Sequence, residues 1–206
     1  MADVSVGAVV PAAGLSTRMG YPKPCLPWGS STVLSHVVGA LREGGANPIV
    51  VVLGYQWQWV LEQHAALAAS PGVVFQFNPA FATGEMLSSV KAGLLALNPR
   101  EHSAFLLCPA DMPMVSPAVV RALLQAHLES PGKIIVPTYA GKKGHPALFP
   151  MELYGEIMGL PSTPYGLKLL GTRHPSLLQT LDLECEGVTL DLDTPGDYQR
   201  LKPQSG

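Results

Sequence analysis

The sequence predicts an α/β fold of three layers, in which a Rossmann-like, mostly parallel sheet lies between helices on both faces. Short apolar runs alternate with amphipathic stretches along the whole chain, as in βαβ units. The runs are continuously apolar, which is typical of strands buried on both faces. The 206 residues are 47% hydrophobic and only 14% charged, enough for a full core. We expect one domain over residues 1–206 rather than two half-size domains.

The first half of the chain predicts three strands and three helices. In chain order these are a strand at 6–10, a helix at 32–43, a strand at 49–53, a helix at 58–69, a strand at 73–77 and a helix at 84–97. The strands are short apolar runs with β-branched residues. The helix at 32–43 carries Val33, Val37 and Leu41 on one face, and a glycine pair follows it. The helix at 58–69 stops before Ser70-Pro71-Gly72, a turn sequence.

The second half continues the alternation with weaker signals. It predicts strands at 105–108 and 133–137, a helix at 116–129, short strands at 147–149 and 188–190, and helices at 162–170 and 195–201. Two helix starts are well marked, because Ser116 and Thr194 are good N-caps and a proline follows each of them.

Composition excludes several classes of protein. The formal net charge is −2, which argues against a large basic surface for nucleic acid. The apolar runs are far shorter than the roughly 20 residues of a membrane span. No basic region precedes an apolar stretch at the N-terminus, so no secretory signal is expected. The cysteines, Cys25, Cys108 and Cys185, lack metal-binding spacing, and we expect a reducing compartment, the cytoplasm.

Parallel sheets bind ligands at the carboxyl ends of their strands, so the residues after each strand carry the functional prediction. Residues 11–23 follow the first strand and are rich in small residues. They also carry Arg18 and Lys23, and such loops bind phosphate groups through backbone N–H groups and cations. The spacing is not that of a P-loop. The alternative is a flexible surface turn with solvated charges.

Three further stretches are candidates. Asp111 follows the fourth strand and is suited to Mg²⁺, although an Asp before Met-Pro is also a common turn. Asp191 and Asp193 share a face in extended chain, and one of them is able to complete a metal site with Asp111. Their alternative role is at a helix N-terminus. Residues 141–146, with two lysines and His145, form either an anion site or a solvated hairpin tip.

Together these motifs resemble the nucleotidyltransferases of the molybdenum cofactor type, within the nucleotide-diphospho-sugar transferase fold. The resemblance runs in the family's order from about Val6 to Leu201. It is carried by Ala12-Ala13-Gly14-Leu15-Ser16-Thr17-Arg18-Met19-Gly20 with Lys23, by Asn78-Pro79 with Gly84 and Ser88-Ser89-Val90, by Ala110-Asp111-Met112-Pro113, by Gly144-His145-Pro146 and by Asp191-Leu192-Asp193-Thr194-Pro195. The last two motifs are more typical of the cytidylyltransferase-like branch.

The resemblance implies a Mg²⁺-dependent enzyme. It would transfer a nucleotide from a nucleoside triphosphate to the phosphate of molybdopterin and release pyrophosphate. The implied catalytic residues are Arg18, Lys23 and Asp111. The implied nucleotide-binding residues are Ala12, Ala13, Gly14, Leu15, Arg18, Lys23, Asn78, Gly84 and Ser88. Asp111 and Asp193 would hold the metal with Asp191 as a further candidate, and His145 would lie near the acceptor.

The motif Pro11-Ala12-Ala13-Gly14 is similar to that of the CTP-using branch, whereas the GTP-using branch carries Leu-Ala-Gly-Gly. One departure is Ala110, because the commonest metal motif of the family has glycine there. The implied partners are CTP and a phosphorylated pterin, with a molybdenum hydroxylase or its maturation chaperone as a protein partner. The alternatives are GTP as donor, a sugar phosphate as acceptor, or a chaperone that binds nucleotide and cofactor with little turnover.

Overall fold

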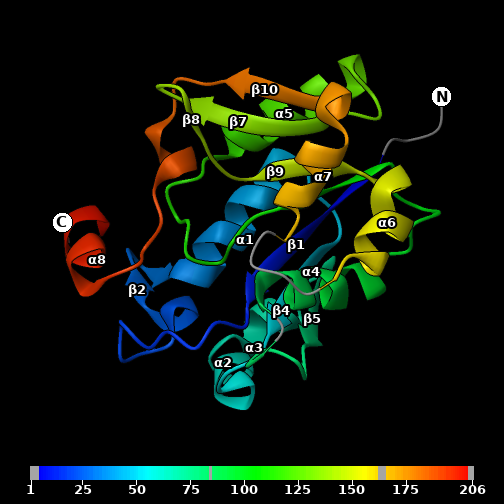
Figure 1. Cartoon of the computed structure of the whole chain (residues 1–206). Coiled ribbons are helices and arrows are strands. Elements are labelled where there is room, and N and C mark those ends of the chain that lie inside the picture. The colour runs from blue at the N-terminus through cyan, green and yellow to red at the C-terminus, as the bar shows by residue number, and fades with distance from the viewer. Residues whose placement is uncertain (1–4, 84, 162–165, 204–206) are drawn as a thin grey trace.

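The computed structural model describes residues 5–83, 85–161 and 166–203, and its central element is an eight-stranded sheet (Figure 1). Neighbouring strands run in the order β10-β7-β9-β6-β1-β4-β5, and β8 pairs with β7. The bounds are β1 (Val6–Ala12), β4 (Ile49–Leu53), β5 (Val73–Phe77), β6 (Ala104–Leu107), β7 (Ile134–Tyr139), β8 (Lys142–Lys143), β9 (Ala147–Pro150) and β10 (Leu178–Asp182). A separate small hairpin joins β2 (Pro27–Trp28) to β3 (Ser31–Thr32).

The sheet is mostly parallel, which confirms the predicted class. β1 runs parallel to both β4 and β6, β4 is parallel to β5, and β7 is parallel to β10. β9 is antiparallel to β6 and β7. β1 is therefore central, and the loop that follows it emerges in the middle of the carboxyl edge of the sheet.

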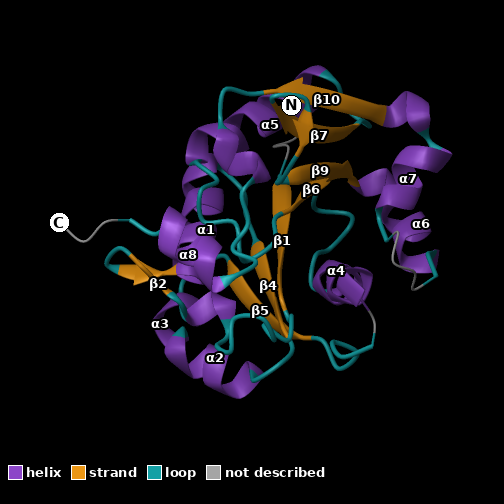
Figure 2. Cartoon of the chain, turned by 60° about the vertical axis from the view of Figure 1, so that its left-hand side comes forward, coloured by secondary structure: helices purple, strands orange, loops and turns teal. Residues whose placement is uncertain are grey.

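Helices cover both faces of the sheet (Figure 2). One face carries α1 (Val33–Gly44), α2 (Trp57–Gln63), α3 (Ala65–Ala68) and α5 (Pro117–Glu129). The other carries α4 (Glu85–Leu95), α6 (Tyr154–Gly159) and α7 (Lys168–Arg173). Short 3₁₀ turns lie at η1 (Lys23–Cys25), η2 (Met151–Leu153), η3 (Pro175–Leu177) and η4 (Glu186–Thr189). The last helix, α8 (Pro195–Leu201), packs Tyr198 against the small cluster that contains Trp28 and Leu192.

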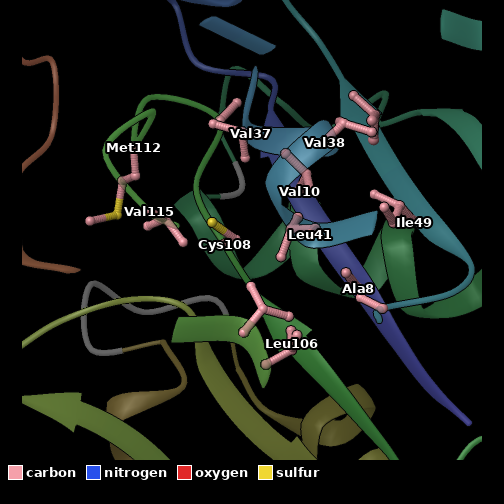
Figure 3. Packing of buried hydrophobic residues seen from close by; sticks show 14 of the residues in the cluster. Ala8, Val10, Val37, Val38, Leu41, Ile49, Leu106, Cys108, Met112 and Val115 are labelled. Carbon is pink, nitrogen blue, oxygen red and sulfur yellow. The ribbon is translucent and has the colours of Figure 1, made fainter. Parts of the chain in front are cut away.

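The neighbouring strands β1, β4 and β6 are continuously apolar because they are buried on both faces. Ala8 and Val10 of β1 pack with Leu41 of α1, whereas Val9 packs with Val90 of α4 on the opposite face. All five side chains are fully buried. Figure 3 shows the first of these clusters, between β1, β6 and α1. The three layers follow directly from this double burial.

The predicted helix starts are confirmed by their capping bonds. The hydroxyl of Thr32 accepts a hydrogen bond from the Ser35 N–H at 3.2 Å, and Ser116 caps α5 in the same way. Thr194 and Asp197 form a reciprocal capping box at the start of α8. These side chains satisfy helical N–H groups that have no partner inside the helix.

The predicted strand at 188–190 is wrong. Residues Glu186–Thr189 form the turn η4, in which Val188 is buried and its carbonyl oxygen accepts from the N–H of His145 at 2.8 Å. The late strand is instead β10, which pairs with β7 at the edge of the sheet. β10 is partly exposed along its length, so it lacks the continuous apolar run that marks β1, β4 and β6.

Two predicted helices also differ from those observed. The helix expected at 58–69 is divided into α2 and α3 at His64, whose Nδ1 bonds to the carbonyl of Val60 at 2.8 Å. Part of the helix expected at 162–170 lies outside the described residues, and α7 begins at Lys168. The short helix α6 was not predicted.

No helix among the described residues is long and apolar enough to cross a membrane. The three cysteines are free thiols, and Cys108 is fully buried in the cluster of Figure 3. Burial raises the pKa of Cys108, and it raises that of Cys25 to about 11. Both thiols are therefore protonated and unreactive at neutral pH.

Candidate active site

A cavity of about 400 Å³ opens at the carboxyl ends of β1 and β6, where the fold predicts a ligand. It is bounded by the loop after β1, the loop after β6, the start of α4 and the segment before α8. Its lining consists of Pro11, Ala12, Ala13, Gly14, Leu15, Ser16, Thr17, Arg18, Lys23, Pro24, Phe81, Glu85, Met86, Ser89, Pro109, Ala110, Asp111 and Asp193. Segments from four distant parts of the sequence thus share one site.

The loop after β1 lines this cavity with residues whose backbone N–H groups are not used in backbone hydrogen bonds. Among the described residues, Gly14, Leu15 and Ser16 donate no backbone hydrogen bond. The loop is nevertheless ordered, because the Ser16 hydroxyl accepts from the Lys23 N–H at 3.2 Å and the Ser16 carbonyl accepts from Gly20. Consecutive N–H groups of this kind make a concave site for an anion such as a phosphate.

Lys23 lies between two carboxylates on one side of the cavity. Its Nζ is 2.8 Å from Asp111 Oδ2 and 3.1 Å from Asp193 Oδ1. Arg18 makes a second contact with Asp193, at 3.2 Å, from a largely exposed position. The loops that carry the two aspartates are joined directly, because the N–H of Leu192 donates to the carbonyl of Asp111 at 3.0 Å. The structure therefore brings together Arg18, Lys23, Asp111 and Asp193 from the sequence-based set.

The two carboxylates shift the pKa of Lys23. Burial by itself would lower that pKa, but Asp111 and Asp193 outweigh it and raise the pKa above its ordinary value. The hydrogen bond from Lys23 in turn lowers the pKa of Asp193, with Arg18 adding to the effect. Burial and the neighbouring carboxylates raise the pKa of Asp191. At neutral pH Lys23 is therefore a cation that lies between the two carboxylates.

The donor set suits a hard divalent cation. Asp111 and Asp193 point oxygens at one position, where the ammonium group of Lys23 now lies, and carboxylate oxygens are the ligands that Mg²⁺ prefers. Among the residues described, no three His, Cys, Asp or Glu side chains gather closely enough to hold a metal alone. Two carboxylates completed by substrate phosphates and water match the usual way in which Mg²⁺ is bound.

The opposite wall of the cavity comes from the segment between β5 and α4. Asn78 itself is buried, and its side-chain amide donates to Ser88 Oγ at 2.8 Å and to Ser89 Oγ at 3.1 Å. Its Oδ1 accepts from the N–H of Ala80 at 3.0 Å. Asn78 thus orders this wall from behind, and Ser89 rather than Ser88 lines the cavity. Gly84 lies outside the described residues.

His145 lies beside this site but does not line it. It follows the β7–β8 hairpin, whose tip carries exposed lysines. Burial is the main cause that lowers the pKa of His145, opposed in part by the charge of Asp111 and reinforced by that of Lys168. Gly144 is packed so closely that a Cβ there would clash with the carbonyl oxygen of Val188. This contact fixes the backbone on which His145 sits.

Sequence reasoning missed several residues that line the cavity. They are Pro24, Phe81, Glu85 and Met86, whereas Ser16, Thr17 and Ser89 stand within the quoted motifs without an assigned role. Phe81, Glu85 and Met86 fall between the motifs, in a stretch with no periodic signal. Their proximity to the predicted Asn78 and Ser88 is the one sequence signal that was able to suggest them.

The motifs of this site agree with comparisons to known proteins. The profile of the MobA-like NTP transferase domain matches residues 8–177, most of the chain. The chain belongs to this family. It is 32% identical over 200 residues to the molybdenum cofactor cytidylyltransferase of Escherichia coli strain K12, covering 96% of each chain. It is also 30% identical over 117 residues, 56% of this chain and 52% of the relative, to the molybdenum cofactor guanylyltransferase of Xanthomonas euvesicatoria.

Solved structures show the same MobA-like fold. The crystal structure of Rv0371c from Mycobacterium tuberculosis H37Rv has a TM-score of 0.79 and 30% sequence identity, covering 98% of each chain. A manganese complex of the Mycobacterium tuberculosis protein has a TM-score of 0.75 and 28% identity, covering 97% of this chain and 98% of that one. The chain therefore belongs to the MobA-like nucleotidyltransferases, and one of the solved structures with this fold contains manganese.

Proposed function

We propose that this protein transfers CMP from CTP to the terminal phosphate of molybdopterin or its molybdenum-bearing form, with Mg²⁺, and releases pyrophosphate. The observation that carries the proposal is the cluster of Lys23, Asp111 and Asp193 beside the free N–H groups of the loop after β1. The motif Pro11-Ala12-Ala13-Gly14 and the relationship to the cytidylyltransferase of Escherichia coli support CTP as the donor.

In the proposed reaction an oxygen of the acceptor phosphate attacks the α-phosphorus of CTP. A phosphorus–oxygen bond forms there, the bond to the β-phosphate oxygen breaks, and its electron pair leaves with pyrophosphate. Such a transfer needs alignment and charge stabilisation rather than covalent help from the protein. The N–H groups of Gly14, Leu15 and Ser16 bind phosphate oxygens in this proposal.

Arg18 and Lys23 stabilise the charge on the leaving pyrophosphate. For Lys23 to do so, its ion pairs with Asp111 and Asp193 must exchange for contacts with the nucleotide. Asp111 and Asp193 would hold Mg²⁺, which would supply further neutralisation of phosphate charge. Once Lys23 contacts the phosphates, Asp111 and Asp193 would be available to hold the metal.

His145 is proposed to contact the acceptor. Its pKa responds to the charges of Asp111 and Lys168, and the exposed lysines of the β7–β8 hairpin add positive charge nearby in the chain. A phosphorylated pterin is an anion, so this positive charge favours it. We place the protein in the cytoplasm and treat it as one domain. No contact of the described residues and no comparison favours a molybdenum hydroxylase as partner.

Pyrophosphate release tests the proposal. CTP and GTP are supplied separately with Mg²⁺, and each is tested with molybdopterin, with a sugar 1-phosphate and without acceptor. Release that requires both CTP and molybdopterin is the expected result. Release with GTP but not CTP would show that GTP is the donor. Release with the sugar phosphate but not molybdopterin would show that a sugar phosphate is the acceptor. Nucleotide binding without release in any mixture would instead favour a cofactor-carrying chaperone.

A further inference from the structure

Glu85 is a charged residue in the cavity that the proposed reaction does not use. It lines the cavity at the start of α4, and its side chain is exposed. Among the described residues its carboxylate has no ion pair and no hydrogen bond, whereas the lining carboxylates of Asp111 and Asp193 are both paired with Lys23. Glu85 is thus an acceptor with unused capacity that faces the ligand space.

The backbone of Glu85 is held in place by a chain of hydrogen bonds. Asn78, which is buried, donates to Ser88 Oγ at 2.8 Å, and that hydroxyl donates to the carbonyl of Glu85 at 2.9 Å. Glu85 itself has φ of +52°, a left-handed conformation that costs a non-glycine residue free energy. Such conformations persist where surrounding contacts hold them, and here the first residue of α4 lines the cavity.

Glu85 belongs to the segment that follows β5, and β5 lies on the opposite side of β1 from β6. In the sheet, β6 with Asp111 is on one side of β1, and β4 and β5 are on the other. Phe81, from the same segment as Glu85, packs on the β4 side. A Cβ at Gly54 would lie only 2.5 Å from that of Phe81 and 2.7 Å from that of Ala13. The carboxylate pair and the Phe81–Glu85 wall therefore flank the loop after β1 from opposite sides.

A carboxylate is a poor neighbour for a triphosphate unless the ligand brings a hydrogen-bond donor to it. The nucleoside end of a nucleotide offers such donors. Phe81 adds an aromatic surface to the same wall. Its ring centroid lies 6.4 Å from that of Phe77, which in turn lies 5.3 Å from that of Trp57. An aromatic face binds a base by stacking.

We propose that Glu85 determines base choice, by accepting a hydrogen bond from the exocyclic amino group of cytosine while Phe81 contacts the face of the base. This inference rests on the proposed function for the identity of the nucleotide. A carboxylate accepts from the cytosine amino group but meets the O4 carbonyl of uracil as acceptor against acceptor. The wall therefore selects CTP and rejects UTP.

Equilibrium binding of the magnesium complexes of CTP, UTP and 2′-deoxyCTP tests this role. Wild type and Glu85→Gln are compared with Glu62→Gln, a change at an exposed glutamate of α2 outside the cavity. We expect wild type to prefer CTP over UTP by about tenfold or more. Glu85→Gln removes most of this preference, because an amide also donates to the uracil carbonyl, and Glu62→Gln retains it. Phe81→Leu weakens CTP and UTP alike, since stacking does not depend on the base edge.

The inference is overturned if Glu85→Gln keeps the wild-type ratio of CTP to UTP binding, or if wild type does not discriminate between them. It is also overturned if Glu85→Gln alters only the ratio of CTP to 2′-deoxyCTP, since the carboxylate would then contact the ribose. Failure of the proposed function looks different. In that case CTP binds with a preference that depends on Glu85, yet no pyrophosphate is released with molybdopterin.

Discussion

The two walls of the cavity differ in whether their carboxylates are paired with cations of the protein. On the β6 side, each carboxylate is paired with a cation of the protein itself, with Lys23 2.8 Å from Asp111 and 3.1 Å from Asp193. On the β5 side, the carboxylate of Glu85 has no such partner among the described residues. On the β6 side the carboxylate charges are already neutralised by cations of the protein, so a ligand that binds there must replace these ion pairs. On the β5 side the charge of Glu85 is not neutralised by a described residue, so a ligand must supply a hydrogen-bond donor to it.

The largest expected effect is a loss of activity on substitution of Asp111, on the wall where the carboxylates are paired. Asp111→Asn removes one of the two carboxylates proposed to hold Mg²⁺, and we expect pyrophosphate release to fall at least about a hundredfold, with the fold intact. Steady-state kinetics and thermal unfolding measure the two quantities. Asp191→Asn is the comparison, because Asp191 does not line the cavity, and we expect only a few-fold loss. Equal losses in the two variants would contradict Asp111 and Asp193 as the metal pair.

A second change, Lys23→Met, removes the shared cation. We expect slower turnover and a rise in the pKa of Asp193, which Lys23 holds below 3.8 in the folded protein. The contribution of Asp193 to stability is complete above its unfolded pKa and is lost as pH falls through the lowered folded value. Lys23, whose pKa is raised from 10.5, contributes fully below that value and loses its contribution as pH rises through the raised one.

Carboxyl titration by NMR and unfolding as a function of pH test this second prediction. The stability difference between wild type and Lys23→Met is expected to be greatest between those two limits and to shrink outside them. Lys202→Met, at an exposed lysine near α8, is a control in which the pKa of Asp193 stays low. An unchanged Asp193 pKa in Lys23→Met would mean that the ion pair is not formed in solution.

The smallest expected effect concerns Asn78, whose hydrogen bonds hold the wall that carries Glu85. Asn78→Ala removes the buried donor to Ser88 and Ser89, and we expect a loss of about 1 to 3 kcal/mol in unfolding free energy. Because Ser88 supports the carbonyl of Glu85, CTP binding should weaken as well. Denaturant unfolding and CTP titration measure these effects. If CTP binding weakened with no loss of stability, Asn78 would contact the nucleotide directly, as the family resemblance implies.

Much of the fold was predictable because local signals agreed with tertiary structure. The strands at 49–53 and 73–77 have the predicted bounds, and the caps Thr32, Ser116 and Thr194 mark real helix starts. The late strand was misplaced for a physical reason. β10 lies at the edge of the sheet and is partly polar, whereas the apolar Val188 fills the core from a 3₁₀ turn.

The candidate site divides in a similar way. Motif residues such as Arg18, Lys23, Asp111 and Asp193 were identified from their types and positions, and the structure places them in mutual contact. Their catalytic and metal-binding roles stay predictions. Glu85 was not identified, because a glutamate at the start of a helix is ordinary in sequence.

The sequence by itself determined the layered fold, the loop after β1 and the kinds of charged residue that follow the strands. Apolar runs and capping residues express their effects over a few neighbours, so they are readable without a structure. Only the tertiary structure decided which charges neutralise one another. Lys23 and Asp193 are 170 residues apart in the chain yet form one ion pair, while Glu85 faces the same cavity without a partner among the described residues. Electrostatic balance depends on distances of a few ångströms, and the packing of the sheet sets those distances.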